Sequence, residues 1–461
     1  MVESVEKQVA EKQAERGARA VYDVVIVGGG VCGTALLYSL SRYTNVEKVA
    51  LVEKNAEVAL VNSRYTSNSQ TLHFGDIETN YTLEKAEKVN AGASLVKAYL
   101  LKYDVCQNIY TKYHKMVLAV GAQQVEKLRD RYAVFKTLFP ELRLIEKEEI
   151  ERLEPNVLKG RDGDEETLAL FTPEGYTVDY QRLSESFVKN AVKDSDKSIE
   201  LMMDTKVLSI ERVVDEAGDR FLVTTNKETF EAKTVAVTSG AHSLLFAKEM
   251  GYGQDYALLS VAGSFYFAPQ LLNGKVYTVQ LAKLPFAAIH GDPEVHDASQ
   301  TRFGPTAKVM PLLERHRYGT MWEYFKTAGL SLDAFRSFFN ILSDWTILTY
   351  IIMNFIYDIP LIGKRLFIRK VRKIVPSVRL RDLSFAKGYG GIRPQIVNLK
   401  TRRLEMGEAK ILGRNILFNI TPSPGASTCL KTAADSCREL VGFLGEGYGF
   451  DEGKMVEDLS L

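Results

Sequence analysis

Three glycines near the start of the chain have the spacing of a dinucleotide-binding turn. Gly28, Gly30 and Gly33 form a GxGxxG pattern. In this pattern the first glycine permits a tight turn, the second lets the backbone approach a pyrophosphate, and the third lets a helix pack closely on a strand. Glu53 lies twenty residues after Gly33, where an acidic side chain can accept a hydrogen bond from a ribose hydroxyl. An acid at this position disfavours a 2′-phosphate and leaves NAD and FAD as candidate cofactors.

The residues around these glycines predict the elements that position them. Residues 22–27 are an almost continuous apolar run of strand-forming residues, residues 34–40 have helical character, and residues 49–52 form a second strand-like run. The helix would begin at the glycines, and its N-terminus would offer unpaired N–H groups and a partial positive charge to phosphates. The stretch therefore predicts a βαβ unit built around a dinucleotide.

A second strand-turn-helix unit near the C-terminus favours FAD over NAD. Residues 416–420 are a predicted strand and residues 429–444 a predicted helix. The intervening turn contains Gly425, Ala426 and Ser427, which we expect to contact the cofactor. NAD does not need this second unit, whereas for FAD the new helix N-terminus can face the flavin edge on which negative charge develops during reduction.

Further cofactor contacts are predicted in three other regions. Residues 62–75 are too polar for a core element and predict a loop that crosses the cofactor. A strand at 234–238 ends on small residues, which suits a sheet end that faces a cofactor or, alternatively, a simple turn. The backbone of Val207 can meet an adenine edge or occupy a plain sheet position. The candidates in these regions, with one in the glycine-rich turn at 388–394, are Asn68, Ser69, Gln70, Thr71, Val207, Ser239, Gly240 and Gly391.

Composition limits the class of protein. The chain has 461 residues, 46% of them hydrophobic, and a net charge of +1, so it can bury a large core and has no overall field that attracts nucleic acid. Its four cysteines form no CxxC pair and no metal-ligand spacing, which indicates a reducing compartment and no metal site. Residues 1–20 carry four acidic and four basic side chains and predict a solvated extension rather than a targeting signal.

One region has the composition of a membrane-contacting surface. Residues 318–357 contain 11 aromatic side chains, and eight basic residues with no acid among them follow between 364 and 381. Aromatic rings lie at the headgroup level of a bilayer, and cations attract anionic lipid. No stretch is long and apolar enough to predict a transmembrane helix. We therefore expect segment 318–381 to contact a membrane surface; the alternative is a helical subdomain with a solvated basic edge.

The predicted fold class is α/β, with a Rossmann-like FAD-binding domain interleaved with an α+β substrate domain that contains a mostly antiparallel sheet. We expect the FAD-binding domain to comprise residues 21–72, 176–243 and 384–450. Helical periodicity between 82 and 139 predicts a helical insertion at 73–175. Alternating residues between 258 and 310 predict the antiparallel sheet of a substrate domain at 244–383.

With these features in view, the chain resembles the FAD-dependent malate:quinone oxidoreductases, particularly their shorter bacterial branch. The resemblance covers nearly the whole chain after residue 21. The matching stretches are VIVGGGVCG at 25–33, NSQT at 68–71, IETNY at 77–81, VAGSFY at 261–266, LPFAAIHGDP at 284–293, RFGPT at 302–306, GIRPQ at 391–395 and PSPGAS at 422–427.

The resemblance implies oxidation of (S)-malate to oxaloacetate, with electrons passing through FAD to membrane quinone. Such a site needs cations for two carboxylates and a base for the hydroxyl proton. Arg302 and Arg393 can each bind a carboxylate through two parallel hydrogen bonds, although Arg302 can instead pair with an acid such as Asp297. His290 is the preferred base and His73 the competing one.

Two other functions are compatible with these residues. The enzyme can act on another 2-hydroxy acid such as 2-hydroxyglutarate, which needs the same two cations at a longer spacing. The chain can also be a flavin-binding, membrane-associated module without turnover. The remaining histidines, His114, His242, His296 and His316, are expected to be surface or structural. The resemblance places the protein in the cytoplasm, peripheral on the inner face of the cell membrane.

Overall fold

A computed structural model gives the fold. It describes residues 19–193, 195–215, 218–280, 289–328, 343, 345–359, 361–405, 409–420 and 424–460. Most of the expected N-terminal extension, part of the resemblance stretch at 284–293, the centre of the aromatic segment and the first residues of the C-terminal turn lie outside the described residues.

The first sheet is built around the predicted βαβ unit. Strands β6, β2, β1, β9 and β20 lie side by side in this order and pair in parallel, while β19 and the β7–β8 hairpin extend the sheet with antiparallel pairs. This parallel order around a glycine turn is Rossmann-like. The strands are β1 (Val21–Val27), β2 (Lys48–Val52), β6 (Ser198–Met202), β7 (Val207–Asp215), β8 (Gly218–Thr225), β9 (Thr229–Val237), β19 (Ala409–Gly413) and β20 (Ile416–Ile420).

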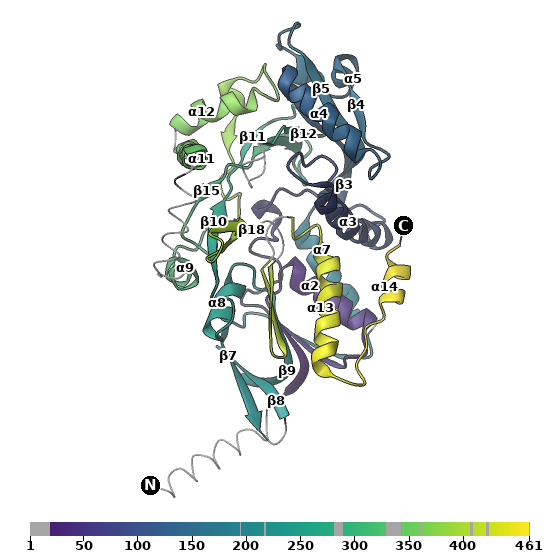
Figure 1. Ribbon diagram of the computed structural model, residues 1–461, viewed down its shortest axis with the longest axis vertical. Coiled ribbons are helices and arrows are strands. Elements are labelled where there is room, and N and C mark those ends of the chain that lie inside the picture. The colour runs from purple at the N-terminus through teal and green to yellow at the C-terminus, as the bar shows by residue number, and fades with distance from the viewer. Residues whose placement is uncertain are drawn as a thin grey trace, which may run out of the picture.

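Strand β1 is apolar throughout because both faces of this sheet are covered. Val24 and Ile26 pack into one core with helices of one face, whereas Val25 and Val27 pack into a second core on the other. Figure 1 shows α2 and α13 on one side of the sheet and α8 on the other. The helices of these layers are α2 (Val31–Tyr43), α3 (Leu83–Tyr103), α7 (Tyr180–Lys193), α8 (His242–Glu249), α13 (Cys429–Leu444) and α14 (Glu452–Asp458).

A second large sheet is antiparallel except where β12 pairs in parallel with β3. Its order is β16-β11-β14-β13-β12-β3-β5-β4. The predicted fold class, a Rossmann-like unit with a mostly antiparallel sheet, is therefore confirmed. The strands are β3 (Tyr110–Val120), β4 (Arg143–Ile145), β5 (Thr167–Val178), β11 (Tyr266–Pro269), β12 (Lys275–Thr278), β13 (His290–Pro293), β14 (Gln300–Gly304) and β16 (Ser384–Phe385).

The segment 73–175 differs from the helical insertion that the sequence suggested. It contains α3 and α4, as expected, but also β3, β4 and most of β5, which complete the antiparallel sheet. A short apolar run in a buried strand cannot be distinguished from a buried helix by periodicity alone. The other helices of this part are α4 (Ala122–Phe135), α5 (Lys147–Leu153) and α6 (Pro155–Leu158).

A small third sheet connects the two large ones. It has the order β15-β10-β17-β18, and β10 pairs with β17 so that Val261 lies opposite Arg393. Its strands are β10 (Tyr256–Ala262), β15 (Lys308–Val309), β17 (Ile392–Asn398) and β18 (Arg403–Glu405). Along one side of the molecule follow α9 (Thr320–Ala328), α11 (Trp345–Tyr357) and α12 (Ile362–Val371) (Figure 1). No helix among the described residues is long and apolar enough to cross a membrane.

Candidate active site

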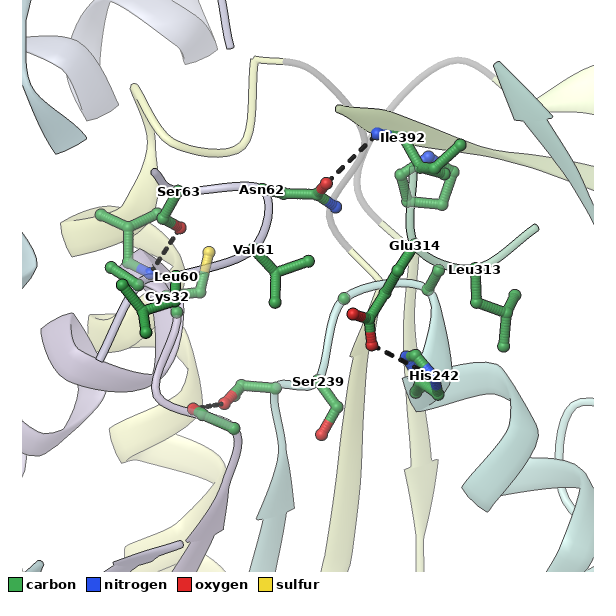
Figure 2. A pocket seen from close by; sticks show the side chains of 18 of the residues that line it. Cys32, Leu60, Val61, Asn62, Ser63, Ser239, His242, Leu313, Glu314 and Ile392 are labelled. Carbon is green, nitrogen blue, oxygen red and sulfur yellow. Dashed lines mark hydrogen bonds and ion pairs between the residues drawn. The ribbon is translucent and has the colours of Figure 1, made fainter. Parts of the chain in front are cut away.

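A cavity of about 430 Å³ opens at the carboxyl ends of β1 and β9, where the glycine turn begins. Figure 2 shows that residues from separate parts of the chain surround it, with Cys32 and Ser63 on one side and His242 and Glu314 on the other. Ligands of open α/β sheets bind at such strand ends. The predicted residues that line it are Gly28, Gly30, Glu53, Asn68, Ser69, Thr71, His73, Val207, Ser239, Gly240, Arg393, Gly425, Ala426 and Ser427.

The glycine turn has the geometry that a pyrophosphate cradle requires. Gly28 has a φ of 109°, a backbone conformation that favours glycine. A Cβ atom on Gly33 would lie 2.0 Å from the carbonyl oxygen of Gly28, so only glycine lets α2 approach the strand this closely. Glu53 supports the turn, because its Oε2 accepts a hydrogen bond from the N–H of Gly29 at 2.7 Å. The structure therefore fits a dinucleotide at the position that the sequence predicted.

Replacing Gly33 with alanine is expected to weaken cofactor binding and lower the thermal midpoint. The added methyl group would overlap the Gly28 carbonyl and lie 2.6 Å from Thr238 Oγ1, and such overpacking costs about 1–3 kcal/mol. Gly163→Ala is the matched control, since no atom lies within 4 Å of the position that its new methyl group would take. Cofactor retained after gel filtration and the melting temperature measure the difference; equal values for the two variants would contradict the cradle.

The polar loop at 62–75 connects the two strand-turn-helix units, as a loop over the cofactor must. Ser63 Oγ accepts from the N–H of Val31 at the start of α2 (3.0 Å), and Asn62 Oδ1 accepts from the N–H of Ile392 (3.2 Å). At the other end, the N–H of His73 donates to Ser427 Oγ at 2.9 Å. Figure 2 shows the Ser63 and Asn62 contacts on opposite sides of the cavity.

Three predicted cofactor residues do not line the cavity but hold its walls. Gly33 lets α2 approach β1, and Gly391 lets its turn approach the loop, because a Cβ atom there would lie 2.4 Å from the carbonyl oxygen of Ser67. Gln70 is fully buried, and its Nε2 donates to Glu294 at 2.9 Å. These three residues therefore position the elements that form the cavity without lining it themselves.

Arg302, which the sequence suggested as a carboxylate clamp, does not line the cavity and has partners within the protein. Its guanidinium is fully buried and pairs with Asp292, with Nη2 at 2.9 Å from Oδ2. It also donates to the carbonyl oxygens of Asn68 at 3.1 Å and Ser69 at 2.8 Å. The acid that pairs with Arg302 is Asp292 and not Asp297, the alternative that the sequence suggested. Strands β13 and β14 place Asp292 directly opposite Arg302. Arg302 thus holds the loop over the cavity, and its guanidinium is engaged by the protein instead of a substrate.

Lys275 completes this buried ionic cluster. Its Nζ lies 2.9 Å from Asp292 Oδ2 and 3.2 Å from Thr71 Oγ1. Burial raises the pKa of the Asp292 carboxyl, but the charges of Arg302 and Lys275 outweigh burial and lower the pKa below its usual range. Two cations around one carboxylate keep it ionised. Because these two cations also donate to Asn68, Ser69 and Thr71, the cluster anchors residues 68–71.

Arg393, by contrast, is available to a ligand. It lines the cavity, and within the described part of the chain its guanidinium makes no hydrogen bond or ion pair. Burial lowers the pKa of the guanidinium, while the phenol groups of Tyr350, Tyr277 and Tyr81 act in the opposite direction. A partly buried cation without a counter-ion among the described residues is a suitable site for an anion, and a carboxylate matches its planar donors.

The two candidate bases lie in different environments. His73 lines the cavity, and its Nδ1 is 2.5 Å from Glu78 Oε1. His290 is 1% exposed, does not line the cavity, and stacks on Tyr277 with ring centroids 4.6 Å apart. The histidine that the sequence ranked second is thus the one that faces the cofactor cavity.

The opposite wall of the cavity was not predicted from the sequence. His242, expected to be surface or structural, lines the cavity together with Leu313 and Glu314 (Figure 2). His242 Nε2 lies 3.1 Å from Glu323 Oε2 and 3.9 Å from Glu314 Oε1. These residues come from α8, α9 and the loop before α9, and no local pattern marks them. Among the described residues, no three potential metal ligands are grouped together.

The fold joins a Rossmann-like unit, with a cavity at its glycine turn, to a mostly antiparallel sheet. Solved structures share this fold. Glycine oxidase from Geobacillus kaustophilus matches with a TM-score of 0.62 and 18% identity over 90% of this chain and 92% of that one. L-α-glycerophosphate oxidase from Mycoplasma pneumoniae, solved with FAD bound, matches with a TM-score of 0.61 and 20% identity over 94% and 97%.

The chain belongs to the malate:quinone oxidoreductase family, whose model matches residues 20–440. It is 42% identical to a probable malate:quinone oxidoreductase of Helicobacter acinonychis, over 95% of this chain and 98% of that protein. It is 41% identical to the malate:quinone oxidoreductase of Helicobacter pylori, over the same shares. Human mitochondrial L-2-hydroxyglutarate dehydrogenase is 22% identical over 89% of this chain and 86% of that protein.

Proposed function

We propose that this chain is a flavoenzyme that oxidises (S)-malate to oxaloacetate and passes the electrons to a membrane quinone. Family membership supports the reaction. The structural observation that carries the proposal is the guanidinium of Arg393, which lines the same cavity as the glycine turn and His73. A cation for a carboxylate, a base for a hydroxyl and a dinucleotide cradle are the parts that oxidation of a 2-hydroxy acid requires.

FAD is the proposed cofactor. The glycine turn fits its pyrophosphate, and Gly425, Ala426 and Ser427 before α13 line the cavity where a second helix N-terminus is useful to a flavin. Glu53 and Val207 line the end of the cavity proposed for the adenosine half. When bound, FAD supplies the acceptor for the hydride that leaves C2 of malate.

The chain's own residues bind malate and remove its hydroxyl proton. Arg393 binds one carboxylate and so orients the substrate, and His73 accepts the proton at its Nε2 atom. We assign this role to His73 rather than to His290, because His73 lines the cavity and has a carboxylate partner. Arg302 contributes indirectly, by holding Asn68 and Ser69 over the cavity.

A steady-state assay tests the proposal. The full chain, loaded with FAD and mixed with malate and a soluble quinone analogue, is expected to reduce the quinone without added NAD. The proposal fails if neither malate nor another 2-hydroxy acid supports quinone reduction by the FAD-loaded protein. Replacing malate with 2-hydroxyglutarate tests the alternative substrate, which is suggested by the 22% identity to a 2-hydroxyglutarate dehydrogenase. A higher kcat/KM for 2-hydroxyglutarate than for malate would change the substrate assignment.

We further propose that α11 and α12 rest on a membrane surface, on the cytoplasmic side where the resemblance places the enzyme. Trp345, the first residue of α11, is 78% exposed, and Leu361, directly before α12, is 84% exposed. The two helices lie together along one side of the molecule (Figure 1). Arg365, Arg369 and nearby cations are exposed beside them. Exposed apolar side chains next to cations match the boundary between headgroups and acyl chains.

Binding to anionic phospholipid vesicles is expected to weaken several-fold when Leu361 is replaced by serine. The leucine side chain would leave the acyl boundary, and each buried CH₂ group contributes about 0.8 kcal/mol. Val105→Ser is the control, because Val105 is 81% exposed elsewhere on the molecule. Vesicle co-sedimentation measures both; equal losses in the two variants, or no binding of the wild type, would contradict the proposed surface.

A further inference from the structure

Glu78 is a buried acid to which the sequence assigned no role. It is 7% exposed, and its Oε1 lies 2.5 Å from Nδ1 of His73. His73 in turn lines the cavity and is anchored through its N–H to Ser427 Oγ. Glu78, which does not line the cavity, therefore contacts the proposed base at its Nδ1 atom.

The charges of a second buried ion pair also act on Glu78. Lys115 Nζ donates to Asp76 Oδ1 at 2.7 Å, and Lys115 is fully buried. Burial raises the pKa of the Glu78 carboxyl, but the hydrogen bond with His73 and the charges of His73 and Lys115 outweigh it and lower the pKa to about 2. The charged or titratable groups that act on Glu78 are His73, Asp76, Tyr81, Lys85, Lys115, Arg131 and Tyr277.

An ionised carboxylate can only accept hydrogen bonds. In the neutral form of the His73 ring, the hydrogen between Glu78 and His73 is therefore carried by Nδ1, which leaves Nε2 as the ring nitrogen with a lone pair. This is the tautomer that a base needs when its other nitrogen faces the substrate. When Nε2 takes a proton, the resulting imidazolium lies against a carboxylate that stabilises it.

We propose that Glu78 is a positioning residue that fixes the tautomer of His73 and stabilises its protonated form. The inference rests on the proposed oxidation of a 2-hydroxy acid. In the reaction, the O–H bond of the substrate breaks and its proton moves to Nε2, while bound FAD would supply the acceptor for the hydride from C2. Glu78 exchanges no proton.

Glu78→Gln tests the proposal, because glutamine keeps the size of the side chain but can donate to Nδ1 and so favour the wrong tautomer. We expect kcat to fall about 10- to 100-fold, the range typical of outer residues that orient a functional histidine, with an unchanged KM for malate. The acid limb of the pH–kcat profile should move to lower pH, because the imidazolium has lost its carboxylate. Glu78→Asp keeps the charge and should restore part of the rate.

Glu84→Gln is the matched control: Glu84 is exposed and pairs with Lys88 on the surface of α3. A readout independent of turnover is the nitrogen NMR signal of the His73 ring, identified by its loss in His73→Gln. In the neutral form of the ring, the wild type should show a protonated Nδ1 and an unprotonated Nε2, and Glu78→Gln should lose this preference.

An unchanged rate profile and an unchanged ring signal in Glu78→Gln would overturn the inference. Because the NMR signal does not require substrate, it also separates the two proposals. If malate is not oxidised but the tautomer depends on Glu78, the proposed function fails and the positioning role stands. If malate is oxidised and the tautomer is independent of Glu78, only the positioning role fails.

Discussion

Replacing His73 with glutamine is expected to lower malate-dependent turnover by about two to four orders of magnitude, the contribution typical of a general base. Glutamine removes the basic nitrogen that lines the cavity but retains a polar side chain beside Glu78. Because the backbone contact of His73 with Ser427 remains, FAD content should not change. Stopped-flow measurement of flavin reduction by malate, with FAD content determined in parallel, gives the comparison.

The same substitution at the rival base separates the two assignments. His290→Gln alters a buried ring that stacks on Tyr277 outside the cavity lining, so its effect on the rate of flavin reduction should stay within about tenfold, short of the loss that removing a general base causes. A larger loss in His290→Gln than in His73→Gln would return the base role to His290, as the sequence first suggested.

Replacing Arg393 with methionine is expected to raise the KM for malate about 10- to 100-fold. A charge-assisted hydrogen-bonded contact of this kind contributes about 1.5–3 kcal/mol, and methionine retains the length of the side chain without the charge. Since Arg393 has no protein counter-ion among the described residues, its loss strands no partner, and the fold should tolerate the change.

Two further variants qualify this result. Arg393→Lys keeps the charge but loses the planar fork and should give an intermediate KM. Arg64→Met removes a positive charge that is exposed on the loop over the cavity and should leave KM near the wild-type value. An equal rise in KM for Arg64→Met and Arg393→Met would indicate a general field effect instead of a clamp.

The parts of the site that the sequence predicted are those encoded locally. The turn at Gly28, Gly30 and Gly33 lies between a strand and a helix that are contiguous in the chain, and residues 416–444 form a second strand-turn-helix unit of the same kind. In both, the residue types and the element boundaries appear together in one short stretch, so spacing alone locates the cofactor end of the cavity.

The parts that were missed depend on pairing between distant strands. Asp292 lies ten positions before Arg302 and meets it only because β13 and β14 are antiparallel in that register. Strand β3 likewise pairs with β5, whose residues begin at Thr167, so the strands of the segment 73–175 were not recognised from its sequence. Glu78 is only five residues from His73, but the charge of Lys115 that also acts on it comes from β3, far along the chain.

The visible spectrum of the purified protein, recorded without oxygen, tests the central claim most directly. The oxidised flavin band should be present, disappear when malate is added, and return when a quinone analogue follows. A protein that binds FAD but keeps its oxidised band in the presence of malate would contradict malate as the substrate, and a protein that binds no flavin under any condition would contradict the proposed cofactor and the chemistry that depends on it.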